Sequence, residues 1–411
     1  MLNRTTGTQT TNPLGERLSG RLAAHFSAIY AAHFVFLGVL LPFFSGWLAL
    51  AGFSPSAIGL INGIALALRL IFAPAIAQIA DQHTDKRKPL LWMTLILVTA
   101  AGLTLVGGHV AIIAVGAAGM IFAFGLMVPL IDSLVLRADR NGLVTYGPIR
   151  AVGTFAFLTA NVALGFYFRQ AGFGPVALVL FFAALAGVGV TLILPSFTDA
   201  AQPSDGDHPH RRAFWADAWR LVSNPIFLLA LFAAGLTQAA HAVYYAYSVL
   251  HWPTLGYSPL TIGWLWAAGV MAEIVLLSLA RPLARRLGVA RLLAIGALAA
   301  GVRWAITATE PTLSVLFCLQ TLHALTFGAA YLGAVEFVDR AVPVRLVNTG
   351  MVIFSTTGVG ALTGVATIIA GFVFEGAGPA AAYALMAILG FTALGLAVVL
   401  GRVWHGQKLF G

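Results

Sequence analysis

The chain has 411 residues, of which 60% are hydrophobic and 9% are charged. Soluble domains carry about 25% charged residues, so this composition excludes an ordinary soluble globular protein. The net charge of +9 does not indicate a nucleic-acid partner, because the basic residues lie in short loops between apolar segments. The single cysteine, Cys318, excludes a disulfide within one chain and a metal site built from cysteines, and we expect no metal.

Twelve apolar segments follow one another along the chain, each long enough for a membrane-spanning helix. The first six are predicted at 22–50, 56–80, 89–107, 110–136, 147–169 and 173–195. The second six are predicted at 225–251, 260–281, 288–308, 311–337, 346–374 and 379–402. The sequence therefore predicts an all-α membrane protein with 12 transmembrane helices in two pseudo-symmetric six-helix bundles.

One long polar stretch separates the two sets of helices, and its composition is typical of a linker. The predicted organisation is a tail at 1–21, an N-terminal bundle at 22–195, a linker at 196–224, a C-terminal bundle at 225–402 and a second tail at 403–411.

The distribution of Lys and Arg predicts the orientation of the helices. Of the 23 basic residues, 19 lie in the tails, the linker and alternate loops, whereas only Arg169 lies on the opposite side. Positively charged loops face the cytoplasm, so both termini and the linker are predicted to be cytoplasmic. We expect a multi-pass protein of the bacterial inner membrane.

The chain contains an internal repeat with an offset of 204 residues. Gly52–Gly59 (Gly-Phe-Ser-Pro-Ser-Ala-Ile-Gly) recurs as Gly256–Gly263 (Gly-Tyr-Ser-Pro-Leu-Thr-Ile-Gly). The same offset relates Arg69 to Glu273 and Asp132 to Glu336. Duplicated halves are typical of alternating-access transporters, and a linker between two sets of six helices fits the major facilitator architecture.

Ionisable side chains inside the predicted helices point to a transport pathway. Each costs about 2.5–3.5 kcal/mol on insertion scales, so each needs a partner or an aqueous cavity. Those in or at the edge of the predicted helices include Arg69, Asp132, Arg150, His241, Glu273, Arg303, His323 and Glu336.

Asp132 and Arg150 are separated by a short turn between two helices, which brings both to a similar depth. A carboxylate paired with arginine stays charged and carries a proton poorly until the pair is broken. The alternative is a static ion pair that only holds the two helices together.

Glu273, Arg303 and His323 come from three consecutive predicted helices and are expected to meet in one bundle. A glutamate that alternates between a charged partner and water would couple protons to transport, because protonation would then favour one conformation. The alternative is an internal charge cluster with no role in turnover.

The helix predicted at 225–251 carries a polar face. Gln238, His241 and Tyr245 share that face at i, i+3 and i+7, and Tyr244 adjoins it. We expect this face to line a cavity, although a lone histidine is more often a hydrogen-bonded filler. Trp304, next to Arg303, is the tryptophan best placed to stack on a ring.

The loop after the second predicted helix contains Asp81, Lys86, Arg87 and Lys88. It is similar to a degraded copy of the major facilitator loop signature, in which basic residues follow an aspartate. Ala77 replaces the usual glycine of that signature. A plain basic cytoplasmic loop is an equally good interpretation.

Several segments together resemble the phenylpropionate permease family of the major facilitator superfamily. They are Leu41–Leu48, Tyr146–Arg150, Gln238–Tyr245, Gly256–Pro259, Gly263–Trp266, Ala272–Glu273, Val302–Trp304 and Leu322–His323. The resemblance implies a proton symporter for aromatic acids, and it implies a monomer.

The charged residues are also similar to those of the lactose permease type of proton symporter. That resemblance implies a substrate-binding role for Asp132 with Arg150. In that type a proton-accepting glutamate lies one turn after the histidine that corresponds to His323, whereas Thr326 stands here and cannot titrate. The proton site is therefore expected at Glu273, with Asp132 as the second choice.

The predicted function is proton-coupled import of a small organic solute, in first place an aromatic carboxylate, by alternating access. The expected proton-coupling residues are Glu273, Asp132 and His323. The expected substrate-binding residues are Arg150, Arg303, Trp304, Gln238, His241, Tyr244 and Tyr245. Arginine holds a carboxylate through paired N–H donors, and the aromatic side chains would pack a ring.

Two other functions stay open at this point. A sugar or nucleoside symporter, or an exporter, would use the same charges on a different substrate. A non-transporting sensor or assembly factor has less need of buried charges. No hydrolase motif, P-loop or other ATP-binding motif is present, so we expect no enzyme activity and no cofactor, with protons as the coupling ion. The expected partners are the substrate and the lipid bilayer.

Overall fold

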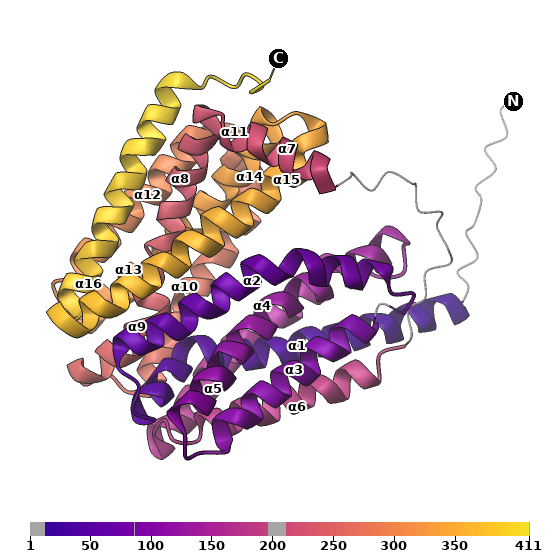
Figure 1. Ribbon diagram of the computed structural model, residues 1–411, viewed down its shortest axis with the longest axis vertical. Helices are drawn as coiled ribbons and strands as arrows, with labels where there is room; N and C mark the ends of the chain where they lie inside the picture. Colours follow the sequence, from indigo (N-terminus) through magenta and orange to yellow (C-terminus); the bar gives the residue numbers. More distant parts are fainter. Residues whose placement is uncertain (1–12, 86, 196–210, 411) are drawn as a thin grey trace, which may run out of the picture.

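The computed structural model of the protein describes residues 13–85, 87–195 and 211–410, and this part is almost entirely helical. Of residues 13–18, 81, 211–215 and 281 it describes the backbone alone. The helices form two groups that follow the chain, an N-terminal one drawn in indigo to magenta and a C-terminal one drawn in pink to yellow (Figure 1).

The N-terminal bundle contains six helices, α1 to α6. Their bounds are Pro13–Leu50, Pro55–Gln82, Arg87–Leu105, Val110–Arg140, Tyr146–Ala171 and Val176–Leu192. The α2 helix begins with Ser54 as its N-cap and a proline in the first turn, the usual chemistry of a helix start.

The C-terminal bundle is more interrupted. It contains α8 (Pro225–Ala239), α9 (Ala242–His251), η1 (Trp252–Leu255), α10 (Pro259–Ser278), α11 (Ala280–Leu287), α12 (Val289–Thr307), α13 (Leu313–Thr321), η2 (Ala324–Ala329), α14 (Ala330–Ala341), η3 (Val344–Leu346), α15 (Val347–Ile353), η4 (Phe354–Ala361) and α16 (Leu362–Val403). Ser258 caps α10 as Ser54 caps α2, so the repeated sequence forms the same local structure twice.

The fold class predicted from the sequence is confirmed. Ten helical stretches in the described part of the chain are long and apolar enough to cross a membrane, and α6 is a shorter apolar helix. The stretch Val344–Val403 has 60 residues, and Gly378 breaks it with a φ of 85° just before Pro379. It therefore supplies the last two predicted crossings.

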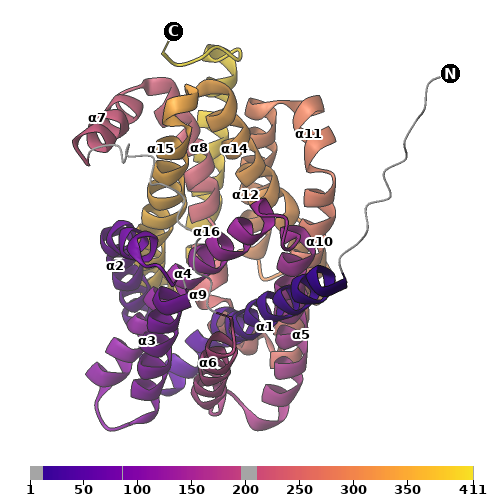
Figure 2. The same cartoon turned by 90° about the vertical axis from the view of Figure 1, so that its right-hand side faces the viewer.

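Two predicted boundaries differ from the structure. The first helix begins at Pro13 instead of 22, so part of the predicted tail is helical. Within the predicted linker 196–224, residues Arg211–Val222 form α7, which packs on the end of the C-terminal bundle (Figure 2). Leu221 is buried there, whereas the neighbouring Trp219 is 73% exposed. This amphipathic pattern was hidden by the polar composition of the stretch as a whole.

Three helices predicted as continuous are interrupted. The helix predicted at 225–251 breaks between α8 and α9, where Ala240 and His241 both have ψ near 0°. The helices predicted at 311–337 and 346–374 contain the π-helical turns η2 and η4. Such turns insert one residue into a helix and are frequent at functional sites.

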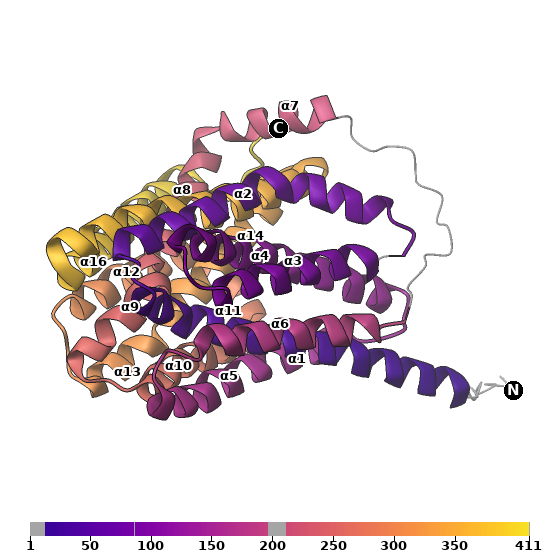
Figure 3. The same ribbon diagram turned by 60° about the horizontal axis from the view of Figure 1, so that its bottom comes forward.

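The two bundles meet closely at one end of the molecule, which we call the closed end. There α2 packs against α16 (Figure 3). A Cβ at Gly59 would lie 2.9 Å from the Thr367 carbonyl oxygen, and a Cβ at Gly371 would lie 2.7 Å from that of Pro55. Tyr247 also donates a hydrogen bond of 2.8 Å to Thr367 O. Only glycine permits these approaches.

The same arrangement recurs between α5 and α10. A Cβ at Gly263 would collide with the Asn161 carbonyl oxygen, and a Cβ at Gly165 would lie 2.8 Å from that of Pro259. Gly263 repeats Gly59, so the repeated sequence explains two related contacts between the bundles. The closed end therefore has the pseudo-symmetry of the duplicated chain.

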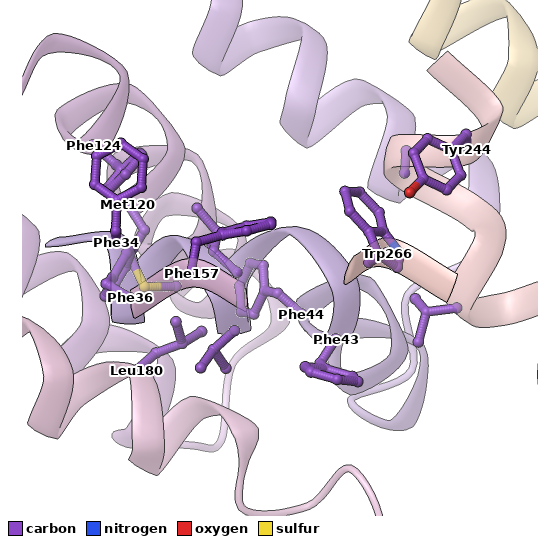
Figure 4. Close-up of a cluster of buried hydrophobic side chains, with 14 of the residues drawn as sticks. Phe34, Phe36, Phe43, Phe44, Met120, Phe124, Phe157, Leu180, Tyr244 and Trp266 are labelled. Carbon is purple, nitrogen blue, oxygen red and sulfur yellow. The ribbon is translucent and has the colours of Figure 1, made fainter. Parts of the chain in front are cut away.

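The buried core is continuous across the closed end. Figure 4 shows aromatic side chains of the N-terminal bundle together with Tyr244 and Trp266 of the other bundle. Phe36 and Phe124 stack with ring centroids 5.5 Å apart, and Tyr244 stacks on Trp266 at 4.3 Å.

A cavity of about 590 Å³ separates the bundles on the other side of these contacts. It is lined by α2, α4, η2, η4, the start of α14 and Gln238 at the end of α8. The bundles touch at one end and are separated by the cavity toward the other end. The cavity therefore opens to one side only, toward the loops that follow α2 and α4.

Candidate functional site

The structure brings Asp132 and Arg150 together in the N-terminal bundle. Arg150 Nε lies 3.8 Å from Asp132 Oδ1. The same oxygen accepts hydrogen bonds from the hydroxyls of Tyr30 and Tyr146, the latter at 3.1 Å. Two neutral donors and one cation thus hold this oxygen and fix the direction of the carboxylate.

Arg150 keeps hydrogen-bonding capacity that no protein group uses. Its guanidinium lies over the rings of Phe34 and Tyr30, with its carbon 4.4 Å and 5.4 Å from their centroids. Its side chain is 32% exposed, and its Nη1 atom is buried with no hydrogen-bond partner in the described part of the protein. Arg150 therefore combines an exposed part that an anion can approach with a buried donor that has no partner.

Arg303 has the opposite environment in the C-terminal bundle. It is fully buried, with an exposed fraction of 0%. Its Nη2 donates to Gln320 Oε1 at 2.6 Å, and its Nη1 donates to Thr326 Oγ1 at 3.2 Å. The guanidinium also lies over Trp304 and Tyr244, at 4.3 Å and 5.0 Å. These contacts fix Arg303 inside its own bundle.

His323 connects Arg303 to Glu273. Arg303 Nη1 lies 3.4 Å from His323 Nδ1, and His323 Nε2 lies 3.5 Å from Glu273 Oε2. Arginine can only donate, so Nδ1 is the acceptor and a neutral His323 carries its proton on Nε2. This tautomer, assigned from the hydrogen-bond network, directs the ring proton at the carboxylate of Glu273.

Thr326, which stands where the lactose permease type has a glutamate, joins two groups. Its hydroxyl lies 2.8 Å from His241 Nε2 and accepts from Arg303. His241 sits at the break between α8 and α9, where its Nδ1 lies 3.1 Å from the carbonyl oxygen of Thr237. The helix break thus turns this histidine into the polar cluster.

Aromatic rings enclose the C-terminal cluster. Tyr244 packs between Trp266 and Trp304, with centroids 4.3 Å and 5.9 Å away, and the ring of Tyr383 stacks on Trp304 at 5.9 Å (Tyr244 and Trp266 are labelled in Figure 4). Tyr245 stacks on His241 at 5.4 Å and keeps part of its surface exposed. Rings of this kind can pack an aromatic or apolar solute.

The two clusters face each other across the interface between the bundles. Helix α5, which carries Arg150, packs against α10, which carries Glu273. These two side chains interact electrostatically. A change of charge in one cluster therefore alters the electrostatic energy of the ionisable groups in the other.

Other predicted residues lie apart from these clusters. Gln238 lines the cavity and donates to the carbonyl of Phe327 at 3.3 Å. Arg69 lines the same cavity from α2. Glu336 is partly exposed and pairs with Arg340 one turn later on α14, at 2.7 Å.

The predicted loop motif is only partly described. The side chain of Asp81 and the whole of Lys86 lie outside the described residues. Arg87 pairs with Asp85 at 3.3 Å and donates to the carbonyl of Leu194 at 3.2 Å, which ties this loop to the end of α6. Lys88 is exposed.

Sequence reasoning missed several residues of the site. Tyr30 and Tyr146, which hold Asp132, carried no pattern that linked them to it across the fold. Gln320, which binds Arg303, lies three residues before His323 and so on the same helical face. That spacing was a usable signal.

The chain matches known proteins over almost its whole length. The family model described as MFS_1 like family matches residues 24–385. The chain is 28% identical over 348 residues to the probable 3-phenylpropionic acid transporter of Escherichia coli (strain K12), which covers 84% of this chain and 89% of that protein. It is 27% identical over 354 residues to the maltose permease of Geobacillus stearothermophilus, which covers 85% and 87%.

Solved structures share the fold. The nucleoside transporter NupG superimposes with a TM-score of 0.69 at 19% identity, covering 93% of this chain and 98% of that one. A bacterial homologue of the human lysosomal transporter Spinster, in an inward-facing and unoccupied conformation, gives a TM-score of 0.68 at 16% identity, covering 94% and 97%. The chain therefore belongs to the MFS_1 like family and is a multi-pass membrane transporter of the major facilitator fold.

Proposed function

We propose that this protein is a proton-coupled symporter that imports an aromatic carboxylate through the bacterial inner membrane. The observation that carries the proposal is that Arg150, which is partly exposed and has an unpaired Nη1, interacts across the bundle interface with Glu273, which lies against His323. One group receives an anion and the other receives a proton, and they lie on opposite sides of the moving interface. The similarity to the probable 3-phenylpropionic acid transporter of Escherichia coli supports an aromatic acid as the solute.

The coupling follows from charge balance. A carboxylate on Arg150 adds one negative charge beside Glu273, and a proton on Glu273 removes one. When both arrive, the net charge of the cleft is unchanged, so the bundles can close over it without burying an uncompensated charge. Either one alone leaves an imbalance that disfavours closure.

The residues of the C-terminal cluster have separate roles in this proposal. Glu273 carries the proton, and His323 passes it because its Nε2 faces the carboxylate. Arg303 is held too firmly to meet the substrate in this conformation, and it orients His323 instead. Tyr245, Tyr244 and Trp266 would pack the ring of the solute. Arg150, which is partly exposed, holds the carboxylate.

Uptake by proteoliposomes tests the proton role of Glu273. Glu273→Gln keeps the shape of the side chain and removes its titration. We expect uphill uptake of 3-phenylpropionate driven by a pH gradient to disappear, while exchange of internal for external solute continues. Glu336→Gln, which removes a carboxylate at the surface, is the matched control and should retain both activities. Undiminished uphill uptake by Glu273→Gln would show that the proton site lies elsewhere.

A solute panel tests the substrate. We expect thermal stabilisation of the purified protein by 3-phenylpropionate and not by its neutral amide, because a bound ligand stabilises the fold by mass action. The relatives also include a maltose permease and a putative nucleoside transporter, so the panel includes maltose and a nucleoside. Stabilisation by either of these, with none by the acid, would replace the carboxylate proposal with the corresponding neutral solute.

A further inference from the structure

Among the described residues that line the cavity of about 590 Å³, Arg69 is the only one with a charged side chain. It makes no hydrogen bond or ion pair with any residue that the structure describes. The carboxylates nearest to the pathway are engaged elsewhere, because Asp132 binds Arg150 and Glu273 lies against His323. The proposed transport site therefore leaves this cation without a counter-charge.

The surroundings of Arg69 fit its guanidinium closely. A Cβ at Gly125 would lie 2.7 Å from Nη1, and a Cβ at Gly360 would lie 3.7 Å from Nη2. Gly125 on α4 thus leaves the space into which the guanidinium extends from α2, and Gly360 on η4 borders that space. Gly360 belongs to the π-helical turn η4, whose Ser355 and Thr356 also line the cavity. An irregular turn opposite an unpaired arginine is typical of a binding site.

The remaining wall of the cavity is apolar and partly aromatic. Phe327 and Tyr331 both line it, and their rings are nearly parallel, 9° apart, with centroids at 6.3 Å. A cavity of this volume is large enough for a small organic molecule, and such sites combine apolar walls with few polar groups. An unpaired arginine and two aromatic rings in the cavity wall are complementary to an aromatic carboxylate.

We propose that Arg69, Phe327 and Tyr331 form a second binding site for an aromatic carboxylate, on the open side of the central clusters. Arg69 binds the carboxylate and the two rings pack the aromatic group. A solute that leaves Arg150 would occupy this site before it reaches the open end. The identity of the solute rests on the function proposed above, whereas the preference of the site for an anion rests on Arg69 itself.

Modification by phenylglyoxal, which reacts with arginine, tests the proposal on the full-length protein in detergent. The rate at Arg69 is followed by mass spectrometry of its peptide. With 3-phenylpropionate at about ten times its dissociation constant, we expect the rate to fall roughly tenfold. The neutral amide should give no protection, and acetate should protect less than the aromatic acid. Equal rates with and without the acid would overturn the proposal.

Two glycine variants separate the position of the guanidinium from its charge. Gly125→Ala places a methyl group where Nη1 now lies, so the flexible side chain must move, and the protection should weaken. In Gly360→Ala the added methyl group makes only an ordinary contact with Arg69. The acid should therefore protect Arg69 in this variant as well as it does in the natural protein. If both variants keep full protection, the guanidinium at this position is not the binding group and the proposal fails.

The same measurement distinguishes this site from the proposed transport function and from lipid. Protection of Arg69 without any transport of the acid would support the second site and contradict the substrate assignment. Transport without protection would contradict the second site alone. Protection by phosphatidylglycerol that the acid does not increase would show that Arg69 binds a lipid phosphate, and would overturn the proposal.

Discussion

The two bundles repeat the same contacts at the closed end but use their interior charges differently. In the N-terminal bundle, Arg150 is partly exposed and shares Asp132 with two tyrosines. In the C-terminal bundle, Arg303 is fully buried and its two terminal nitrogens have partners. The first arginine is partly exposed and retains an unpaired donor, and the second serves as a fixed support for His323. Duplication thus preserved the packing of the helices while the chemistry of the halves diverged.

The largest effect on stability is expected when Arg303 is substituted. Arg303→Gln leaves the buried oxygens of Gln320 and Thr326 without their donor, and it creates empty space among the rings. We expect a loss of about 2–4 kcal/mol of stability. Arg150→Gln should lose less than about 1 kcal/mol, because that ion pair is partly exposed, but it should abolish uptake. Thermal unfolding in detergent, with uptake measured in parallel, compares the two variants.

The opposite ranking would contradict the comparison. If Arg150→Gln were the more destabilised variant, the Asp132–Arg150 pair would be a structural link between α4 and α5. If Arg303→Gln were stable and inactive, Arg303 would be a substrate ligand that becomes exposed in another conformation.

A smaller effect is expected at the closed end, where the bundles are alike. Gly263→Leu and Gly59→Leu should each prevent close approach of the bundles, at a cost of about 1–3 kcal/mol to this conformation alone. Such a cost shifts the equilibrium about 5- to 150-fold, and transport should fall accordingly.

The conformational shift has its own readout. A cysteine that replaces the buried Thr367, in a Cys318→Ser background, should react faster with a maleimide when Gly263→Leu is present. Gly189→Leu is the control, since a side chain there meets no atom within 4 Å. Unchanged labelling of the Thr367→Cys reporter in the Gly263→Leu variant would mean that the contact at Gly263 does not close this end.

The sequence predicted most of the fold, because apolar length and charge distribution are local properties of the chain. It also predicted that Asp132 lies near Arg150, and that Glu273 lies near His323, because short connections bring neighbouring helices together. It did not predict the π-helical turns, because one inserted residue barely alters the apolar period. It did not predict the break at His241 either, because the segment around it carries no proline or glycine to mark a break. The partnership of Tyr30 with Asp132 joins residues 102 positions apart, which no local pattern encodes.

The smallest effect is expected at Glu336, and the repeat allows a direct comparison of this position with its counterpart in the other bundle. Glu336 corresponds to Asp132 by the offset of 204 residues, yet it pairs with Arg340 on the same helix, and both are partly exposed. Such pairs contribute about 0.3–0.5 kcal/mol, so Glu336→Gln should barely change the unfolding temperature or uptake. Asp132→Asn should reduce uptake strongly, because it weakens the hold on Arg150. Similar losses of uptake in the two variants would show that this position has the same role in both halves. The proposed chemical difference between the bundles would then be wrong at this position.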